Sequence, residues 1–379
     1  MDKVIYFALF ILLSGVISLA NTQDYEGPEY NSEGDKSPHY SCEKSTTTVN
    51  GIPMPCAGHL IFHDDFGGNS LDPQKWTAER RIPRAPDYEF NYYIDDVEEI
   101  LKVENGVVRI KPKSTAAHLG QCEMERAPLN LGENCTADID SDECVIKPTV
   151  LKLVPPYISA QFTSKYKFAF KYGRVEVRAK MPQAMWVYPQ LWLQPNYPRY
   201  GNTKLYYSGQ MRIGQTRDDG PKKDLITGLV INTKPDWYYL LLCINGTTQN
   251  LSDEFHTYEM LWTPDVITFS LDNTEYCRFE VNSEEESFRN RKVGWSKMPN
   301  RNYLQRGTKW APFDEEFYLL FGEGVGGYSN FPDDGWSVEK PWQRTQTHSM
   351  MIFRDNMKSN TTWLDRADLE IDYVKVYSV

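Results

Sequence analysis

The chain has 379 residues, of which 40% are hydrophobic, and its formal net charge is −11. This length suits one large all-β domain or two average domains, and the composition supports a sizeable core. The acidic balance argues against nucleic acid and anionic lipid surfaces as electrostatic partners, so a neutral ligand is the easiest to reconcile with the charge.

Residues 1–20 have the features of a secretory signal peptide. Val4–Leu13 is an uninterrupted apolar run that is too short to span a bilayer, and Ser18-Leu19-Ala20 is a small-x-small cleavage pattern. We therefore expect cleavage after Ala20 and a secreted, extracellular protein with no membrane span. Sequons for N-glycosylation fit that compartment and occur at Asn134, Asn245, Asn250 and Asn360.

Seven cysteines in a secreted chain imply disulfides and one remaining thiol. Two pairs bracket short polar loops and are natural short-range partners: Cys42 with Cys56, and Cys135 with Cys144. Of the other three cysteines we favour Cys243 paired with Cys277, which leaves Cys122 free. No C-x-x-C motif and no ligand spacing among the histidines occur, so we expect neither a metal site nor a cofactor.

The segment 21–56 predicts an acidic tail and a disulfide loop, and short alternating strands follow from about residue 57. Alternation is clear at 106–113 and 173–181 and in the final stretch, 369–378, while 266–271, the turn Asp272-Asn273 and 274–281 predict a hairpin. There is no long segment with a 3.6-residue period and no internal repeat. These features predict an all-β sandwich over 57–379 with long loops at 114–148 and 282–312.

The stretch KLYYSGQMRIGQTRDDG (204–220) carries an unusual polar pattern. In an extended strand Gln210 and Arg212 point to one face, and Gly214 then interrupts the alternation before Gln215. Two interpretations are open. The strand is either a solvent-facing surface with a bulge, or the polar floor of a site whose chemistry has changed.

Several stretches, in chain order, resemble glycoside hydrolase family 16, the laminarinase-type β-glucanases: AGHLIFHDDFGGNSLDPQKWTAE (57–79), YGRVEVRAKMPQAMWVYPQLWLQP (172–195), FHTYEMLWTPDVITFSLDN (255–273), PFDEEFYLLFGEGVGG (312–327) and IDYVKVYSV (371–379). Within that family, TTTVNGIPMPCAGHLIF and LVPPYISAQF look most like the invertebrate Gram-negative-bacteria-binding and β-1,3-glucan recognition proteins. The resemblance implies a β-jelly-roll of two curved antiparallel sheets with a glycan cleft on the concave face. Many relatives of this type carry a separate amino-terminal glucan-binding module, for which residues 21–56 are too few, so we expect none here.

In active members of this family the cleft strand carries Glu-x-Asp-x-x-Glu after Ser-Gly, and a bulge keeps all three side chains on the cleft side. Here Ser208-Gly209 matches, but Gln210 stands at the nucleophile position, Arg212 at the Asp and Gln215 at the acid/base. A retaining glycosidase needs two carboxyl groups about 5–5.5 Å apart, and an amide supplies neither a proton nor a nucleophile. Arg212 also places positive charge where an oxocarbenium-like transition state needs negative charge. The resemblance therefore implies a pseudo-glycosidase and not an enzyme.

The first hypothesis for function is a pattern-recognition protein of innate immunity that binds β-1,3-glucan or a related neutral microbial polysaccharide. The chain is rich in aromatic residues, with 24 Tyr and 10 Trp, and sugar sites combine such flat apolar faces with polar groups. The candidates for glycan contact are Trp186, Tyr188, Trp192, Tyr207, Gln210, Arg212 and Gln215. Trp192 is equally consistent with a place in the core.

Two other hypotheses remain. The second is an interaction scaffold without sugar affinity, which would meet another protein of an immune cascade, because Arg212 could pair with a carboxylate across the cleft and plug it. The third and weakest is a residually active β-1,3-glucanase that uses other carboxylates. Retention on insoluble glucan separates the first hypothesis from the second.

Overall fold

The computed structural model describes residues 42–379, except for 98, 121–126, 150–152, 219–222, 235–236, 247–249, 291, 294–295, 298–299, 345 and 361. The expected signal peptide, residues 21–41 of the expected tail, and Cys122 lie outside these described residues. Cys42–Val379 forms one compact unit. None of the helices in the described part of the chain is long and apolar enough to cross a membrane.

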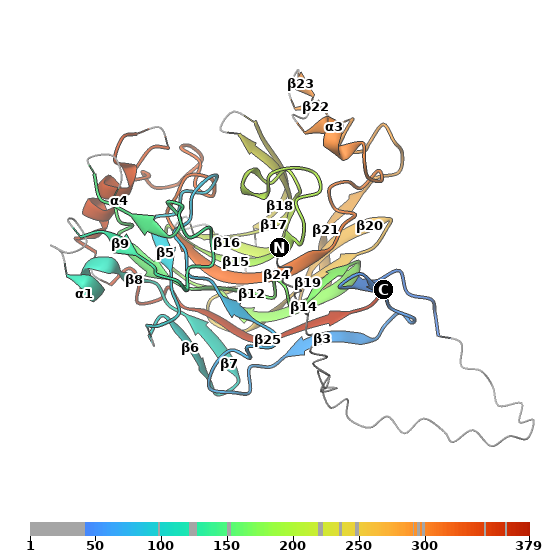
Figure 1. The fold of residues 1–379 in the computed structure, drawn as a ribbon, viewed down its shortest axis with the longest axis horizontal. Helices are drawn as coiled ribbons and strands as arrows, with labels where there is room; N and C mark the ends of the chain where they lie inside the picture. The colour runs from blue at the N-terminus through green and yellow to red at the C-terminus, as the bar shows by residue number, and fades with distance from the viewer. Residues whose placement is uncertain are drawn as a thin grey trace, which may run out of the picture. The chain divides into compact units, whose positions relative to one another are not determined.

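Two antiparallel sheets lie one above the other in Figure 1 and enclose the main core. The first sheet runs in the spatial order β18 (Trp237–Gly246), β17 (Lys223–Lys234), β16 (Gln210–Asp218), β15 (Val187–Pro195), β24 (Phe317–Val325), β13 (Ala169–Lys171), β1 (Thr48–Val49) and β2 (Ile52–Pro53), with β12 (Gln161–Thr163) beside β24 and β4 (Thr77–Ala78) beside β12. The second sheet runs in the order β21 (Thr274–Glu280), β20 (Val266–Leu271), β19 (His256–Trp262), β14 (Gly173–Lys180), β25 (Leu369–Tyr377), β7 (Val107–Ile110) and β6 (Leu101–Glu104), with β3 (Leu60–Asp64) beside β25. This is the predicted all-β sandwich.

Smaller elements decorate the two sheets. They are a three-stranded sheet of β5 (Asn91–Tyr93), β11 (Tyr157–Ser159) and β8 (Lys113–Ser114), the pairs β9 (Leu129–Asn130) with β10 (Val145–Ile146) and β22 (Lys292–Val293) with β23 (Ser296–Lys297), the helices α1 (Thr115–Leu119), α3 (Arg301–Leu304) and α4 (Ser349–Met357), and the 3₁₀ turn η1 (Thr203–Leu205). The expected loops at 114–148 and 282–312 therefore contain several of these short strands and helices.

The local sequence pattern explains the strands of the second sheet. In β14, Val175, Val177 and Ala179 are fully buried while the charged residues between them are only half-buried, as alternation across a strand with one solvated face requires. The predicted hairpin is formed by β20 and β21. Its two turn residues, Asp272 and Asn273, both have positive φ, as a type I′ turn demands.

Strand β15 differs from β14 because both of its faces are covered. Leu191 and Leu193 point into the core between the sheets. Tyr188 and Trp192 belong instead to a second cluster of buried aromatic residues, with Phe331 and Trp342 among its members. By alternation this cluster lies on the opposite, concave side of the first sheet, so the same side that carries the polar pattern of β16 is partly filled by aromatic rings.

The structure joins the three cysteine pairs expected from the sequence: Cys42–Cys56, Cys135–Cys144 and Cys243–Cys277. The third pair connects β18 of the first sheet to β21 of the second, so it links two edge strands of the sandwich. Residues 42–56, which the sequence analysis grouped with the tail, supply β1 and β2, and β1 pairs with β13 of the first sheet.

Candidate functional site

The polar pattern of β16 depends on a bulge. Arg212 pairs with Gly228 of β17 and Gln215 pairs with Ile226, so three steps along β16 face two steps along its partner. The extra residue returns Gln215 to the face that Gln210 and Arg212 already occupy. The bulge that the sequence predicts around Gly214 is thus present, and the three side chains lie on one side of the sheet.

Two glycines make this backbone possible. Gly209 enters the strand with a φ of +82°, in the left-handed region, and a Cβ there would lie 2.8 Å from Phe313. Gly214 faces the core, where a Cβ would lie 3.1 Å from Met181 and 3.2 Å from Tyr258. A side chain at Gly214 would therefore push β16 away from the second sheet.

The side chains of β16 bind one another. The Arg212 guanidinium donates from Nε to Oε1 of Gln210 at 2.8 Å and from one terminal nitrogen to Oε1 of Gln215 at 3.2 Å and Oδ1 of Asn330 at 2.8 Å. Its central carbon lies 4.6 Å from the centre of the Trp192 ring. Gln210, Arg212 and Gln215 are only 0%, 4% and 3% exposed. We call these three residues with Asn330, which is half-buried, the β16 cluster; its three β16 side chains are closed to solvent.

The partners of Arg212 are amides and not carboxylates. Among the described residues, none of the carboxylates makes an ion pair with its guanidinium. Asp87 interacts with Arg212 through its charge. Burial raises the pKa of the Asp87 carboxyl, and the positive charge of Arg212 opposes that rise. Asp87 in turn accepts a hydrogen bond from the Tyr206 hydroxyl. Arg212 thus fills the centre of the concave face through neutral partners.

The aromatic candidates on β15 are buried. Trp186 is 3% exposed, and its ring centre lies 4.7 Å from that of Trp336 within the second aromatic cluster. Tyr188 and Trp192 are 1% and 2% exposed and stack on each other. Tyr207 is half-buried. In this structure Trp186 therefore offers no open face to a sugar, because neighbouring aromatic side chains from distant parts of the sequence cover it.

An open cavity of about 410 Å³ adjoins the β16 cluster. It reaches Trp192 and Tyr206, but Gln210, Arg212 and Gln215 do not line it. We call it the Tyr166 cavity; its walls are Thr77, Glu79, Arg81, Pro83, Arg84, Ala85, Pro86, Asp87, Glu89, Thr136, Ala137, Glu143, Gln161, Thr163, Lys165, Tyr166, Gln190, Trp192, Gln194, Thr203, Tyr206, Tyr318 and Leu320. Of the seven candidates for glycan contact given in the sequence analysis, Trp192 alone lines this cavity. The sequence feature that could have pointed to this cavity is the run ERRIPRAPDYE (79–89), in which charged residues are interspersed with prolines and a tyrosine.

A chain of hydrogen bonds forms the floor of the Tyr166 cavity. Arg81 donates to Oε1 of Gln161 at 2.8 Å, and Nε2 of Gln161 donates to Oε1 of Gln190 at 2.6 Å. Gln190 then donates to Glu89 at 2.7 Å, and Glu89 also accepts from the Tyr93 hydroxyl at 2.6 Å. These side chains come from four separate segments of the chain. Their mutual bonds hold the amides in fixed orientations at the bottom of the cavity.

One group in this floor titrates near neutral pH. Burial, with a further contribution from the nearby Asp87 carboxylate, raises the pKa of Glu89 to about 7. The hydrogen bonds that Glu89 accepts from Tyr188 and Tyr93, and the charge of Arg81, oppose that rise. The floor is therefore a mixture of neutral amides, one arginine and carboxyl groups that hold protons more tightly than usual.

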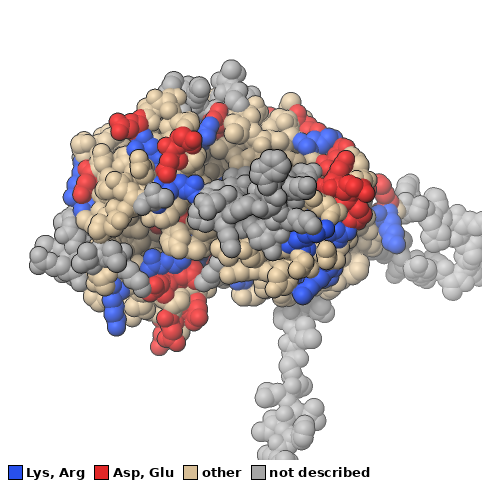
Figure 2. All heavy atoms as spheres, turned by 90° about the horizontal axis from the view of Figure 1, so that it is seen from above, with Lys and Arg blue, Asp and Glu red and all other residues tan. Residues whose placement is uncertain are grey.

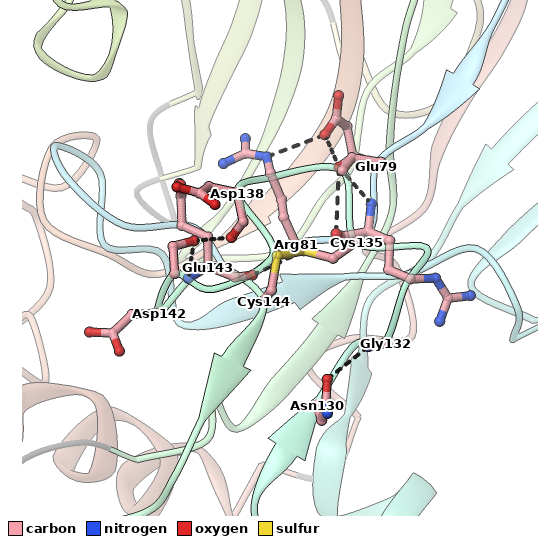
Figure 3. The surroundings of a disulfide bond; sticks show 12 residues. Glu79, Arg81, Asn130, Gly132, Cys135, Asp138, Asp142, Glu143 and Cys144 are labelled. Carbon is pink, nitrogen blue, oxygen red and sulfur yellow. Dashed lines mark hydrogen bonds and ion pairs between the residues drawn. A yellow bond between two sulfur atoms is a disulfide. The ribbon is translucent and has the colours of Figure 1, made fainter. Parts of the chain in front are cut away.

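The Cys135–Cys144 disulfide lies beside Glu79 and Arg81 (Figure 3). Its loop contributes Thr136, Ala137 and Glu143 to the lining of the Tyr166 cavity. The Thr136 hydroxyl donates to the Glu79 carboxylate, and the amide of Thr136 donates to the carbonyl of Arg80 at 2.9 Å. The amide of Ile82 donates in turn to the carbonyl of Glu143 at 2.7 Å. These contacts bind the disulfide loop along the segment that carries Arg81.

The four sequons lie at different depths. Asn134 and Asn360 are exposed, whereas Asn245 and Asn250 are half-buried. Asn250 also donates from its side chain to Asp253. Glycosylation at these positions stays a prediction.

Comparison with known proteins connects this chain to one family. A family model described as glycosyl hydrolases family 16 matches residues 244–307. The chain is 41% identical over 344 residues to Gram-negative bacteria-binding protein 3 of Drosophila melanogaster, a match that covers 89% of this chain and 68% of that protein. It is 32% identical over 351 residues to β-1,3-glucan-binding protein 1 of Manduca sexta, covering 90% and 69% respectively.

Solved structures agree on the fold. The laminarinase of Rhodothermus marinus superimposes with a TM-score of 0.53 at 21% sequence identity, over 85% of this chain and 98% of that chain. At this identity the likeness concerns the jelly-roll fold alone.

Proposed function

Because this chain belongs to the family of Gram-negative bacteria-binding and β-1,3-glucan-binding proteins, we propose that it is a secreted recognition protein of innate immunity that binds β-1,3-glucan without hydrolysing it. The names of its relatives support the ligand. The apolar run and cleavage pattern in residues 1–20 support secretion. The lack of hydrolysis is supported by the chemistry of the concave face.

The observation that carries the proposal is the β16 cluster. Hydrolysis with retention needs one carboxylate to attack the anomeric carbon and a second carboxyl group to move a proton. At the corresponding places stand Gln210 and Gln215, whose amide oxygens both accept hydrogen bonds from Arg212. The guanidinium also repels the positive charge that develops on the sugar ring. Each of these features opposes glycosidic cleavage.

The scaffold hypothesis keeps one observation in its favour, namely that the Arg212 guanidinium is buried on the concave face and donates to Asn330. A single pair of measurements separates the candidates. The secreted protein is incubated with insoluble β-1,3-glucan and with soluble laminarin, and both retention and release of reducing sugar are measured. We expect retention on the glucan and no sugar release above a heat-inactivated control. Sugar release would contradict the lack of hydrolysis, and loss of retention would favour the scaffold.

A further inference from the structure

Tyr166 occupies a position that structural stability does not explain. It lies in the turn between β12 and β13, where the amides of Lys167 and Phe168 both donate to the carbonyl of Ser164. Its φ of +65° lies in the left-handed region, which favours glycine and is uncommon for a bulky side chain. Yet the side chain is 86% exposed, so burial of the ring does not offset the cost of this backbone conformation.

The ring of Tyr166 is held at the edge of an open cavity. The ammonium group of Lys165 lies 4.9 Å from the ring centre, which orients the ring without burying it. Both residues line the Tyr166 cavity, together with the amides of Gln161 and Gln194 on its floor. An exposed aromatic face beside side-chain amides matches a pyranose ring, which has an apolar face of C–H groups and hydroxyls around its edge.

The charges that line the cavity favour a neutral ligand. Glu79, Asp87, Glu89 and Glu143 are countered by Arg81, Arg84 and Lys165. Raised pKa values leave Asp87 and Glu89 less ionised than ordinary carboxyl groups. Figure 2, which views the protein from above, likewise shows basic and acidic residues side by side over the described surface in view. An anionic ligand would meet carboxylates as well as cations.

The cavity is also large enough for a segment of oligosaccharide. Its volume of about 410 Å³ falls within the range of about 300–1,000 Å³ typical of small-molecule sites. The β16 side chains next to it are 4% exposed or less and do not line this cavity. As the described residues define it, this open part of the concave face lies beside the strand that carries the catalytic groups of active relatives.

We propose that a neutral hexose unit of the glycan binds in the Tyr166 cavity, stacked on the Tyr166 ring and hydrogen-bonded to the amides of Gln161 and Gln194, beside the β16 cluster and not over it. This inference rests on the proposed glucan binding. It assigns Tyr166 the role of the stacking platform.

The experiment is a calorimetric titration of laminarihexaose, a neutral β-1,3-linked glucose oligosaccharide, into the full secreted protein and its variants. Tyr166→Gly removes the ring and relieves the backbone, so it should lower affinity about tenfold while the melting temperature stays the same or rises. Tyr166→Phe keeps the ring and should bind within about twofold of the wild type. The control is Tyr197→Ala, because Tyr197 is 66% exposed but does not line the cavity; its affinity should not change.

Three outcomes would overturn the inference, and they are distinguishable. Wild-type binding that is unchanged in Tyr166→Gly would remove the platform and leave the proposed function standing. A Tyr166→Gly variant that loses affinity and also melts at a lower temperature would show that the ring acts through folding. A wild type that binds neither laminarihexaose nor insoluble glucan would overturn the proposed function together with this site.

Discussion

Two neighbouring regions of the concave face, the β16 cluster and the Tyr166 cavity, have polar side chains but differ in what surrounds them. In the β16 cluster the guanidinium of Arg212 reaches three amide oxygens, and the three side chains of β16 are buried. In the Tyr166 cavity the amides are also bonded to one another, but open space lies above them. The bulged strand β16 thus keeps its three polar side chains on one face, while an open cavity lies beside them.

The largest expected effect comes from restoring the carboxyl groups of β16. The bulge is intact, so Gln210→Glu, Arg212→Asp and Gln215→Glu together should place three carboxyl groups on one face. We expect laminarin hydrolysis above the level of the wild type, since acid–base assistance alone is worth about 10²–10⁴-fold. The restored activity should be partial, because Asn330 still lies beside these side chains and catalysis tolerates little misplacement of the reacting groups. Reducing-sugar release is the measurement, and a correctly folded but inactive triple variant would show that the closed region is remodelled beyond these three side chains.

Trp186→Ala tests whether the buried ring of Trp186 contributes to stability and not to glycan binding. The ring is packed against Trp336 and Trp342, so its removal should lower the free energy of unfolding by about 3–5 kcal/mol. Glucan affinity per folded molecule should not change. Denaturant unfolding and titration of the folded fraction measure the two quantities. A large loss of affinity with unchanged stability would return Trp186 to the binding surface, as the sequence first suggested.

The ionisation of Glu89, on the floor of the Tyr166 cavity, should make the stability of the protein depend on pH. Its pKa is about 7 in the folded protein against an ordinary 4.5, so the folded state keeps a proton that the unfolded state loses. Stability should therefore fall as pH rises from about 4.5 to 7, by up to about 3 kcal/mol from this group. Glu89→Gln cannot titrate and should flatten this part of the profile. Parallel profiles of the wild type and the variant, measured by denaturant unfolding at several pH values, would contradict the assignment.

Arg212→Ala tests what holds the β16 cluster closed. The substitution leaves the buried amide oxygens of Gln210 and Gln215 without their donor, which should cost about 1–3 kcal/mol of stability. The matched control is Arg199→Ala, since Arg199 forms a partly exposed ion pair with Glu315 at 2.9 Å and should contribute less than about 1 kcal/mol. Equal effects of the two substitutions in denaturant unfolding would mean that Arg212 does not organise the cluster.

Features set by local chain geometry were predictable from the sequence. The alternation of β14, the β20–β21 hairpin and the bulge before Gln215 depend on neighbours along the chain, and the structure contains all three. The family resemblance supplied the jelly-roll. Trp186 shows the limit of such reasoning, because its cover comes from Phe331, Trp336 and Trp342, which no spacing near Trp186 reveals.

The Tyr166 cavity could not be predicted for the same physical reason. Its walls combine the segments around Arg81, Thr136, Gln161 and Gln190, which meet only through pairing of distant strands and through the Cys135–Cys144 loop. In the sequence, Tyr166 is an ordinary tyrosine in a turn. Its positive φ and its exposure become visible only in the folded chain.

The most direct test of this account is a crystal structure of the protein with laminarihexaose. We expect density for a glucose ring against Tyr166, within hydrogen-bonding distance of Gln161 or Gln194, and an undisturbed β16 cluster in which Arg212 still contacts Gln210 and Asn330. Density for the oligosaccharide lying over Gln210, Arg212 and Gln215, with the cluster opened and the Tyr166 cavity empty, would contradict it.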